Sequence, residues 1–277
     1  MDIEKLEMKS RKTEDSFKLW NCYIINANYE EQKQLVKQLY DFFGEIGNKF
    51  WYIRKSYLNQ SHLRVRFPMD VQGFEKFLLN KNYTTSKVVY EPEVYLFGGQ
   101  LGLEICHKIF CEITELCCLF TLENLNKDKY YAFIAWYSNF CVNKIIQDDF
   151  ERWDCWKKIL ELRAFDESKY KMMLLNMISE INLIIRLDIE KTLEDVNQNI
   201  KDEILKINTN LIKLFEELQR LYYHGKLTRG IRGIVSCLII FMWNILGVQP
   251  GIQAGYSYSF SYLTSPDRGY KHGDFSH

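Results

Sequence analysis

FWYIR at residues 50–54 and HLRVRF at residues 62–67 are the two segments that decide the fold. The first is rich in aromatic and β-branched residues, which favour strands. The second alternates strictly between apolar and polar residues, as a strand with one buried face does. Its polar face carries His62, Arg64 and Arg66. Pro68 then ends the segment, so the sequence predicts two neighbouring strands joined by the loop 55–61.

Further elements flank this strand pair on both sides. The apolar, aromatic-rich segment 19–27 is typical of a strand, and 28–43 carries apolar residues at helical spacing. After Pro68, residues 71–79 fit a short helix and 84–90 a β-rich strand. The order strand, helix, strand, strand, helix, strand predicts an α+β fold with a ferredoxin-like antiparallel sheet.

The pattern becomes helical after Gly98-Gly99, which predicts a helical C-terminal half. Segments with helical character are 101–120, 130–146, 153–162, 169–187 and 193–223, and the apolar run 234–248 fits a buried core helix. The apolar stripe along 193–223 fits packing on the chain's own helices, with a coiled coil with a partner as the alternative. His224-Gly225 is a typical helix end.

We expect residues 1–277 to form a single domain in three parts. An α/β sandwich part spans 15–100, a helical part spans 101–248, and a tail rich in Tyr and Ser spans 249–277. The tail alternates aromatic with small residues and has no helical period. We therefore expect an edge strand, a lid or a partly disordered segment there.

Composition excludes several classes of protein. Lys+Arg and Asp+Glu both number 36, so no basic excess indicates a nucleic-acid partner. The charged start at Met1–Lys5 is unlike a signal peptide, and the run 234–248 is short for a membrane span of about 20 residues. We expect a soluble, cytoplasmic protein without membrane contact.

The eight cysteines show no CxxC spacing, so we interpret them as buried, inert thiols.

Standard catalytic and cofactor signatures are absent, including nucleophile elbows, phosphate-binding loops and zinc motifs. We therefore expect neither metal nor cofactor. The least ordinary feature is a set of basic groups on the central strand pair. If the two strands pair, Arg54 is expected to converge with His62, Arg64 and Arg66 on one surface suited to carboxylates or amides. An ordinary solvated sheet face is the alternative.

Three motifs in this order resemble a known family. FWYIR at 50–54, HLRVRF at 62–67 and YEPE at 90–93 leading to Gly98-Gly99 are similar to the C-terminal domain of lantibiotic dehydratases. The same domain occurs alone as a thiopeptide-type bacteriocin biosynthesis domain. The resemblance covers residues 15–105, and compatible helices extend it to 248. It implies an enzyme that modifies a ribosomally made precursor peptide.

The family has two chemistries, and departures from its pattern choose between them. Eliminating members remove glutamate from glutamylated Ser or Thr, and they read Glu-Arg-Tyr-Gly-Gly where this chain has Tyr95-Leu96-Phe97-Gly98-Gly99. Their late histidine and arginine correspond here to Phe241 and Ile245. Leucine, phenylalanine and isoleucine can neither take a proton nor hold a carboxylate. The departure favours the thiopeptide pyridine synthases, which join two dehydroalanines in a formal aza-[4+2] cycloaddition and expel water and the leader peptide.

Cyclisation mainly requires a pocket that holds two alkenes together. It also requires a polar group that assists tautomerisation and loss of water. The residues that we expect to act in catalysis are Tyr57, His62, Tyr95 and Ser236. Those that we expect to bind substrate are Arg54, Arg64, Arg66, Phe241, Trp243 and Asn244. Plain core packing is the alternative for Phe241 and Trp243.

The expected partner is a precursor peptide with its leader, together with other enzymes of the same pathway. An acidic leader would suit the basic face. Two other functions remain open: a divergent glutamate eliminase, with a histidine close to Arg54, and a non-catalytic recognition subunit. A pocket between the sheet and segment 234–248 would favour an enzyme, and a flat surface there would favour the recognition subunit.

Overall fold

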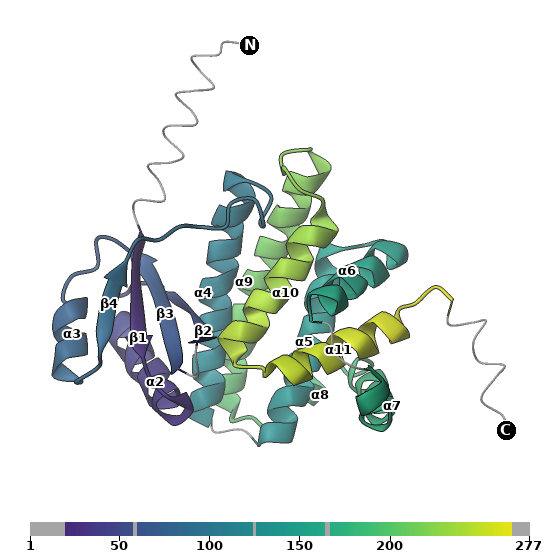
Figure 1. Cartoon of the computed structure of the whole chain (residues 1–277), viewed down its shortest axis with the longest axis horizontal. Helices are drawn as coiled ribbons and strands as arrows, with labels where there is room; N and C mark the ends of the chain where they lie inside the picture. Colours follow the sequence, from purple (N-terminus) through teal and green to yellow (C-terminus); the bar gives the residue numbers. More distant parts are fainter. Residues whose placement is uncertain (1–19, 58–59, 124–125, 164–166, 268–277) are drawn as a thin grey trace, which may run out of the picture.

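A four-stranded antiparallel sheet forms the N-terminal part of the molecule (Figure 1). The structure is a computed structural model, and it describes residues 20–57, 60–123, 126–163 and 167–267. The strands and helices of this part are β1 (Trp20–Asn26), α2 (Tyr29–Glu45), β2 (Trp51–Tyr57), β3 (Gln60–Pro68), α3 (Phe74–Asn80) and β4 (Thr85–Val88). The sheet order β2-β3-β1-β4 confirms the ferredoxin-like arrangement expected from the sequence.

Aromatic residues fill the layer between this sheet and its two helices. Phe67 of β3 lies 5.2 Å from Phe43 of α2 and 4.4 Å from Phe74 of α3, measured between ring centroids. A capping box at Asn28 and Glu31 starts α2, because each side chain accepts a hydrogen bond from the other's backbone N–H. The apolar face of β3 is therefore buried as its alternation indicates.

The register of β2 and β3 corrects the expected basic surface. Arg54 pairs with Leu63, whereas Lys55 pairs with His62. Residues directly opposite each other share a face of the sheet, so Arg54 lies on the face of Leu63 and away from Arg64. The two strands pair as expected, but the four basic groups do not converge on one surface.

Eight helices make up the described C-terminal part: α4 (Gln100–Glu123), α5 (Lys127–Ile145), α6 (Asp149–Leu162), α7 (Glu167–Ile184), α8 (Ile189–Thr192), α9 (Gln198–Tyr223), α10 (Ile231–Leu246) and α11 (Pro250–Leu263). Helix α10 packs against α4, α5, α6 and strand β2, and it is buried over most of its surface. It is the core helix that the apolar run 234–248 predicts, and it joins the sheet to the helical part (Figure 1).

Helix α9 is shorter than the sequence pattern indicates. Asn197 caps its start, and residues 193–196 before it are not helical; they separate α9 from the short helix α8, which Asp188 caps. Its buried stripe contains Ile204, Ile207 and Leu211, and the helix packs on α4 and α5 of the same chain. Packing within the chain is confirmed for this stripe.

The expected irregular tail is wrong for residues 250–263, which form helix α11. Pro250 stands in the first turn, where its missing N–H costs nothing. Gly255 allows close contact with α7, since a Cβ there would lie 2.6 Å from Met177 Sδ. Because α11 is buried against both α6 and α7 and carries no charged residue, its sequence shows no one-sided polar pattern. Residues 268–277 lie outside the described ranges.

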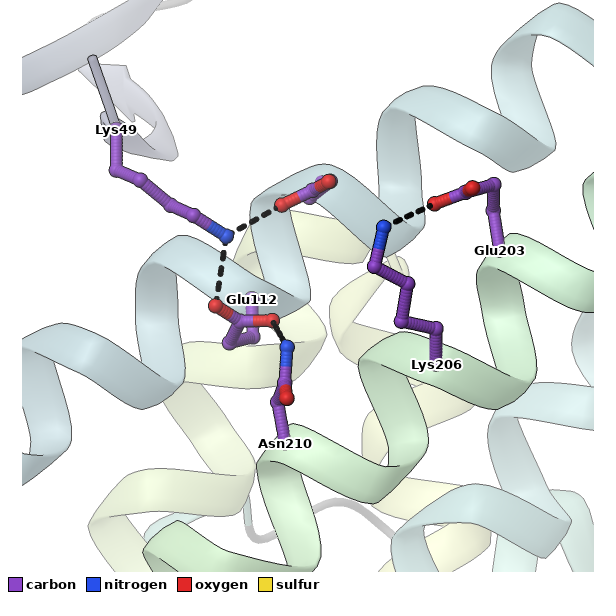
Figure 2. Close-up of polar contacts among 6 residues, drawn as sticks. Lys49, Glu112, Glu203, Lys206 and Asn210 are labelled. Atoms are coloured by element: carbon purple, nitrogen blue, oxygen red, sulfur yellow. Dashed lines mark hydrogen bonds and ion pairs between the residues drawn. The ribbon is translucent and has the colours of Figure 1, made fainter. Parts of the chain in front are cut away.

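A polar network ties the loop before β2 to two helices (Figure 2). Lys49 Nζ lies 2.7 Å from a carboxylate oxygen of Glu112 and 2.7 Å from one of Glu115, both on α4. Asn210 of α9 donates a hydrogen bond of 3.3 Å to Glu112. Burial alone would lower the pKa of Lys49, but these carboxylates outweigh it and raise that pKa above its ordinary value. The network thus fixes the edge of the sheet part on α4 and α9.

The described residues contain no helix long and apolar enough to cross a membrane, and no group of His, Cys, Asp or Glu side chains placed to hold a metal ion. All eight cysteines are buried and free. Burial raises the pKa of Cys111 and of Cys155 to about 12, so both are neutral thiols near pH 7.

Candidate functional site

Arg54 is the sequence-predicted site residue that reaches a pocket. Its guanidinium donates hydrogen bonds to the Ile245 carbonyl (3.3 Å), to Gln32 Oε1 (3.1 Å) and to the Tyr52 hydroxyl (3.3 Å). These acceptors belong to α10, α2 and β2, so three elements hold one side chain. All three acceptors are neutral oxygens, and arginine stays protonated in proteins. Arg54 therefore keeps a positive charge that these contacts do not neutralise.

The pocket beside Arg54 has a volume of about 370 Å³. We call it the Arg54 pocket. Its lining is Tyr29, Lys33, Arg54, Cys117, Phe120, Thr121, Lys127, Tyr130, Tyr131, Leu246, Gly247 and Gln249. Three of these described residues are basic and none is His, Asp or Glu. The pocket lies between the sheet part and the C-terminal end of α10, so that region is hollowed rather than flat.

Two neutral tyrosine hydroxyls lie near Arg54: that of Tyr130, which lines the pocket, and that of Tyr52, which is buried outside the lining and bonds to Arg54. The Tyr130 hydroxyl donates to the Leu246 carbonyl at 2.7 Å, and the Tyr52 hydroxyl donates to Cys117 Sγ at 3.1 Å. Burial, chiefly, raises the pKa of Tyr52 and of Tyr130 well above the ordinary tyrosine value. Both phenols therefore keep their protons and act as hydrogen-bond donors, not as bases.

Gly247 lets α10 end against Arg54. Its φ is +73°, and an added Cβ would stand 3.0 Å from Arg54 Nε. Glycine is the residue that adopts this left-handed helix end without strain. A larger residue would push the guanidinium out of position.

Ser236 and Trp243 lie in the helical core, outside the lining of the Arg54 pocket. Ser236 Oγ contacts the carbonyl of Arg232 at 2.7 Å and that of Cys155 at 3.1 Å. Trp243 is fully buried and donates from Nε1 to Ser138 Oγ at 2.8 Å. Both side chains have packing and hydrogen-bonding partners within the core.

Phe241 and Asn244 are partly buried on α10, and each contacts a residue of another helix. Phe241 stacks on Phe110 of α4, with centroids 5.3 Å apart. Asn244 Oδ1 accepts a hydrogen bond of 3.1 Å from Gln253 of α11. The structure therefore does not bring these two residues to Arg54.

The remaining catalytic candidates are dispersed as well. Tyr95 is 70% exposed in the turn before α4, with Arg229 over its ring at 5.5 Å. His62 is buried on the sheet face opposite Arg54. Tyr57 ends β2 opposite Gln60, and its side chain lies outside what the structure describes.

Arg66 is built into the opposite sheet face. It is only 4% exposed, and its guanidinium lies 4.2 Å from the Trp51 ring centroid and 5.0 Å from that of Tyr90. Such cation–π contacts stabilise a buried charge. Arg64 is partly exposed on the same face. A peptide would therefore meet Arg64 there, with Arg66 beneath the surface.

Sequence reasoning missed Tyr130 and Gly247 as site residues. Tyr130 lies near the start of helix α5, and nothing in the neighbouring sequence marks it as a site residue. Gly247 did carry a signal, because a glycine directly after a long apolar run is a typical helix end. A helix end is a place where backbone carbonyls become available to a guanidinium.

A family model described as lantibiotic biosynthesis dehydratase C-term matches residues 20–258. The chain belongs to this family. The resemblance inferred from the motifs at 50–54, 62–67 and 90–99 is thereby confirmed, and it places the chain in the biosynthesis of ribosomally synthesised, modified peptides. No curated protein matches the chain by sequence.

Two solved structures share the family fold. One is the tRNA-dependent lantibiotic dehydratase MibB from Microbispora sp. 107891, with a TM-score of 0.60 and 12% identity; the match covers 91% of this chain and 28% of that chain. The other is TsrL, with a TM-score of 0.56 and 12% identity, covering 91% of this chain and 95% of that one. At this identity the likeness concerns the fold. This lantibiotic dehydratase C-terminal family member spans little more than a quarter of the length of MibB.

Proposed function

We propose that the chain is a pyridine-forming cyclase that acts on a precursor peptide carrying two dehydroalanines. The reaction is a formal aza-[4+2] cycloaddition between one alkene and an azadiene made from the other alkene and its neighbouring amide. Loss of water and of the leader peptide, released as an amide, then gives the aromatic ring. The precursor with its leader is the partner, together with enzymes that install the dehydroalanines, and the cytoplasm is where such a precursor is made.

The observation that carries this proposal is the chemistry of the Arg54 pocket. Elimination of glutamate requires a base that removes the α-proton. The described lining of the pocket has no imidazole and no carboxylate. Cycloaddition requires no such base, because positioning the two alkenes can supply most of the rate enhancement.

The substitutions seen in the sequence are also consistent with cyclisation. Phe241 packs in an aromatic cluster with Phe97 and Phe110, and Ile245 is fully buried. Leu96 is partly buried, and its carbonyl accepts a hydrogen bond from Arg229. The apolar side chains at these three positions supply neither a proton acceptor nor a cation.

Within this mechanism Arg54 is the group best placed to bind a peptide carbonyl. A guanidinium or a neutral phenol donating to the amide oxygen would favour the imidic acid tautomer and assist the later departure of water. We propose Arg54 for these roles, since its guanidinium has more N–H donors than its three protein acceptors use; Tyr130 can assist only when its hydroxyl releases the Leu246 carbonyl. Neither requires a change of protonation state in the enzyme.

A second candidate function is glutamate elimination, which the three basic residues of the pocket favour. Lys33, Arg54 and Lys127 would suit the two carboxylates of a glutamyl leaving group. This reading needs a base from outside the described lining.

Mass spectrometry separates the candidates. Purified protein is incubated with a leader-bearing peptide that contains two dehydroalanines. Release of the leader as an amide, with a new pyridine absorbance in the product, is the expected result. Should that peptide stay unchanged while a glutamylated precursor loses glutamate, elimination replaces cyclisation. Binding without change of either peptide would identify a recognition subunit.

A further inference from the structure

A second hollow adjoins the Arg54 pocket on the helical side of the molecule. It lies between α5, α7 and α11, has a volume of about 630 Å³, and we call it the α7 groove. Tyr131 lines both cavities. The Tyr256 hydroxyl of α11 donates to the Tyr131 carbonyl at 2.8 Å and so fixes α11 against α5 at this junction. The two cavities therefore meet at Tyr131.

The charge of the lining residues changes at that junction. The Arg54 pocket is bordered by Lys33, Arg54 and Lys127, whereas the α7 groove has the carboxylates Asp128 and Glu180 and no basic residue in its described lining. Most of the other groove residues are apolar, among them Ala132, Met177, Ile181 and Ile184. The sign of the charge thus reverses between the adjacent residues Lys127 and Asp128.

From this polarity we propose that the α7 groove binds an apolar segment of the precursor peptide, next to the residues that react in the Arg54 pocket. The inference rests on the proposed function and names the part of the substrate that the enzyme selects. An acidic segment is disfavoured in the groove because Asp128 and Glu180 would repel it. An uncharged, apolar segment buries its side chains against α7 and α11. The groove is thus a specificity subsite for this segment.

Short synthetic peptides test this assignment by binding alone. Each carries fluorescein, a central Ala-Ala pair that cannot react, and one flank of either Leu, Val and Phe or of Glu; both orders of flank and pair are made. Fluorescence anisotropy then gives the affinity of the full chain for each peptide. We expect the better apolar-flanked peptide to bind about tenfold more tightly than its Glu-flanked counterpart.

Two variants locate the preference. Ala132→Trp fills the groove, and Ile184→Lys places an ammonium group in it that attracts the Glu flank; both are expected to abolish the difference between the two peptides. Asn139→Trp is the matched control, since it adds the same side chain to α5 at a position outside both described linings. It should leave the preference intact, and a normal far-ultraviolet circular dichroism spectrum establishes that each variant folds.

Equal affinity of the wild type for both kinds of peptide would overturn the inference. So would a preference that survives in both groove variants. Because these peptides cannot cyclise, a failure of the proposed chemistry leaves the binding result unaffected. Conversely, pyridine formation without any preference for the apolar flank would remove the groove from the mechanism and leave the cyclase standing.

Discussion

Arg54 owes its position to acceptors contributed by both halves of the fold. Gln32 and Tyr52 belong to the sheet part, and Ile245 belongs to the core helix of the helical part. A planar guanidinium can meet several acceptors at once, whereas an ammonium is a point charge on a flexible stem. The position of this side chain therefore depends on the shape of the guanidinium as well as on its charge.

Arg54→Lys tests that geometry. The charge is kept, but the fork of hydrogen bonds is lost, so we expect kcat/KM for cyclisation to fall about 10- to 100-fold. Steady-state kinetics followed by mass spectrometry measures it. Arg64→Lys, on the opposite sheet face, is the matched control and should stay within about twofold of the wild type. An equal loss of kcat/KM in Arg64→Lys would indicate that the substrate binds on the opposite face of the sheet.

Ser236→Ala tests the core position of a serine that the sequence singled out for catalysis. The hydroxyl contacts only carbonyls and a thiol in the helical core. We expect unchanged turnover and a loss of about 1 kcal/mol in the free energy of unfolding. Urea denaturation and the cyclisation assay measure the two quantities. A large loss of activity with full stability would restore a catalytic role.

At the scale of elements, the turn before α4 depends on a glycine. Gly98 has φ +78°, and a Cβ there would stand 2.5 Å from Ile234 Cδ1 on α10. Gly98→Ala should therefore destabilise the fold by about 2 kcal/mol. Gly44→Ala is the matched substitution in helix α2, where an added Cβ meets nothing within 4 Å. It should stabilise by about 0.5–1 kcal/mol, so urea denaturation of the pair should give opposite signs.

Helices α5 and α10 are coupled by the hydrogen bond from Trp243 to Ser138. We expect Trp243→Phe and Ser138→Ala each to destabilise by about 1–3 kcal/mol and, combined, to be non-additive by about 1 kcal/mol. A double-mutant cycle in urea measures this coupling. Trp243→Phe combined with Ser236→Ala is the control, because seven helical residues separate the two sites by about 10 Å. That second pair should be additive, and additivity in both pairs would show that the hydrogen bond contributes nothing.

The sequence predicts the elements better than their contacts. Alternation in HLRVRF identifies β3 because one face of it must be buried, and the apolar run 234–248 identifies the core helix for the same reason. The face on which Arg54 lies could not be predicted in this way. A shift of the pairing by one residue exchanges the two faces of a strand, and no local pattern fixes that shift. The sequence also placed the loop at 55–61, whereas the pairing continues to Tyr57 and Gln60.

The site was predictable only where a motif carried it. Arg54 stands in a family motif, but Tyr130 and Gly247 meet it from positions distant in the chain. From the sequence, Ser236 is expected in the site as a polar catalytic group and Trp243 as part of a shaped apolar pocket. In fact their polar atoms bond to Cys155 and Ser138 within the core. Partners of this kind cannot be recognised before the packing of the helices is known.

For the whole molecule, His107 sets part of the response of stability to acid. Burial, and then the positive charge of Arg66, lower the pKa of His107 to about 3, and its Nε2 shares a hydrogen bond of 2.6 Å with the Tyr90 hydroxyl. In the unfolded chain the pKa is about 6.5. Between these values the unfolded state binds a proton that the folded state does not, so stability is full above about pH 6.5 and is lost as pH falls toward 3.

The expected loss from this histidine between pH 7 and pH 5 is about 2 kcal/mol in the free energy of unfolding. Urea denaturation of the wild type and of His107→Gln at both values measures it. The variant lacks the titrating group. Its loss of stability between pH 7 and pH 5 should therefore be about 2 kcal/mol smaller than that of the wild type. Parallel pH profiles for the two proteins would contradict the assignment.

The hydrogen bond from Arg54 to the Ile245 carbonyl joins positions 191 residues apart. During translation the sheet part emerges from the ribosome long before the end of α10 does. A nascent chain therefore has the guanidinium but not the wall of the cavity that surrounds it. The pocket is completed only when residues 245–249 emerge, so an unfinished chain lacks the site at which we propose that the precursor peptide reacts.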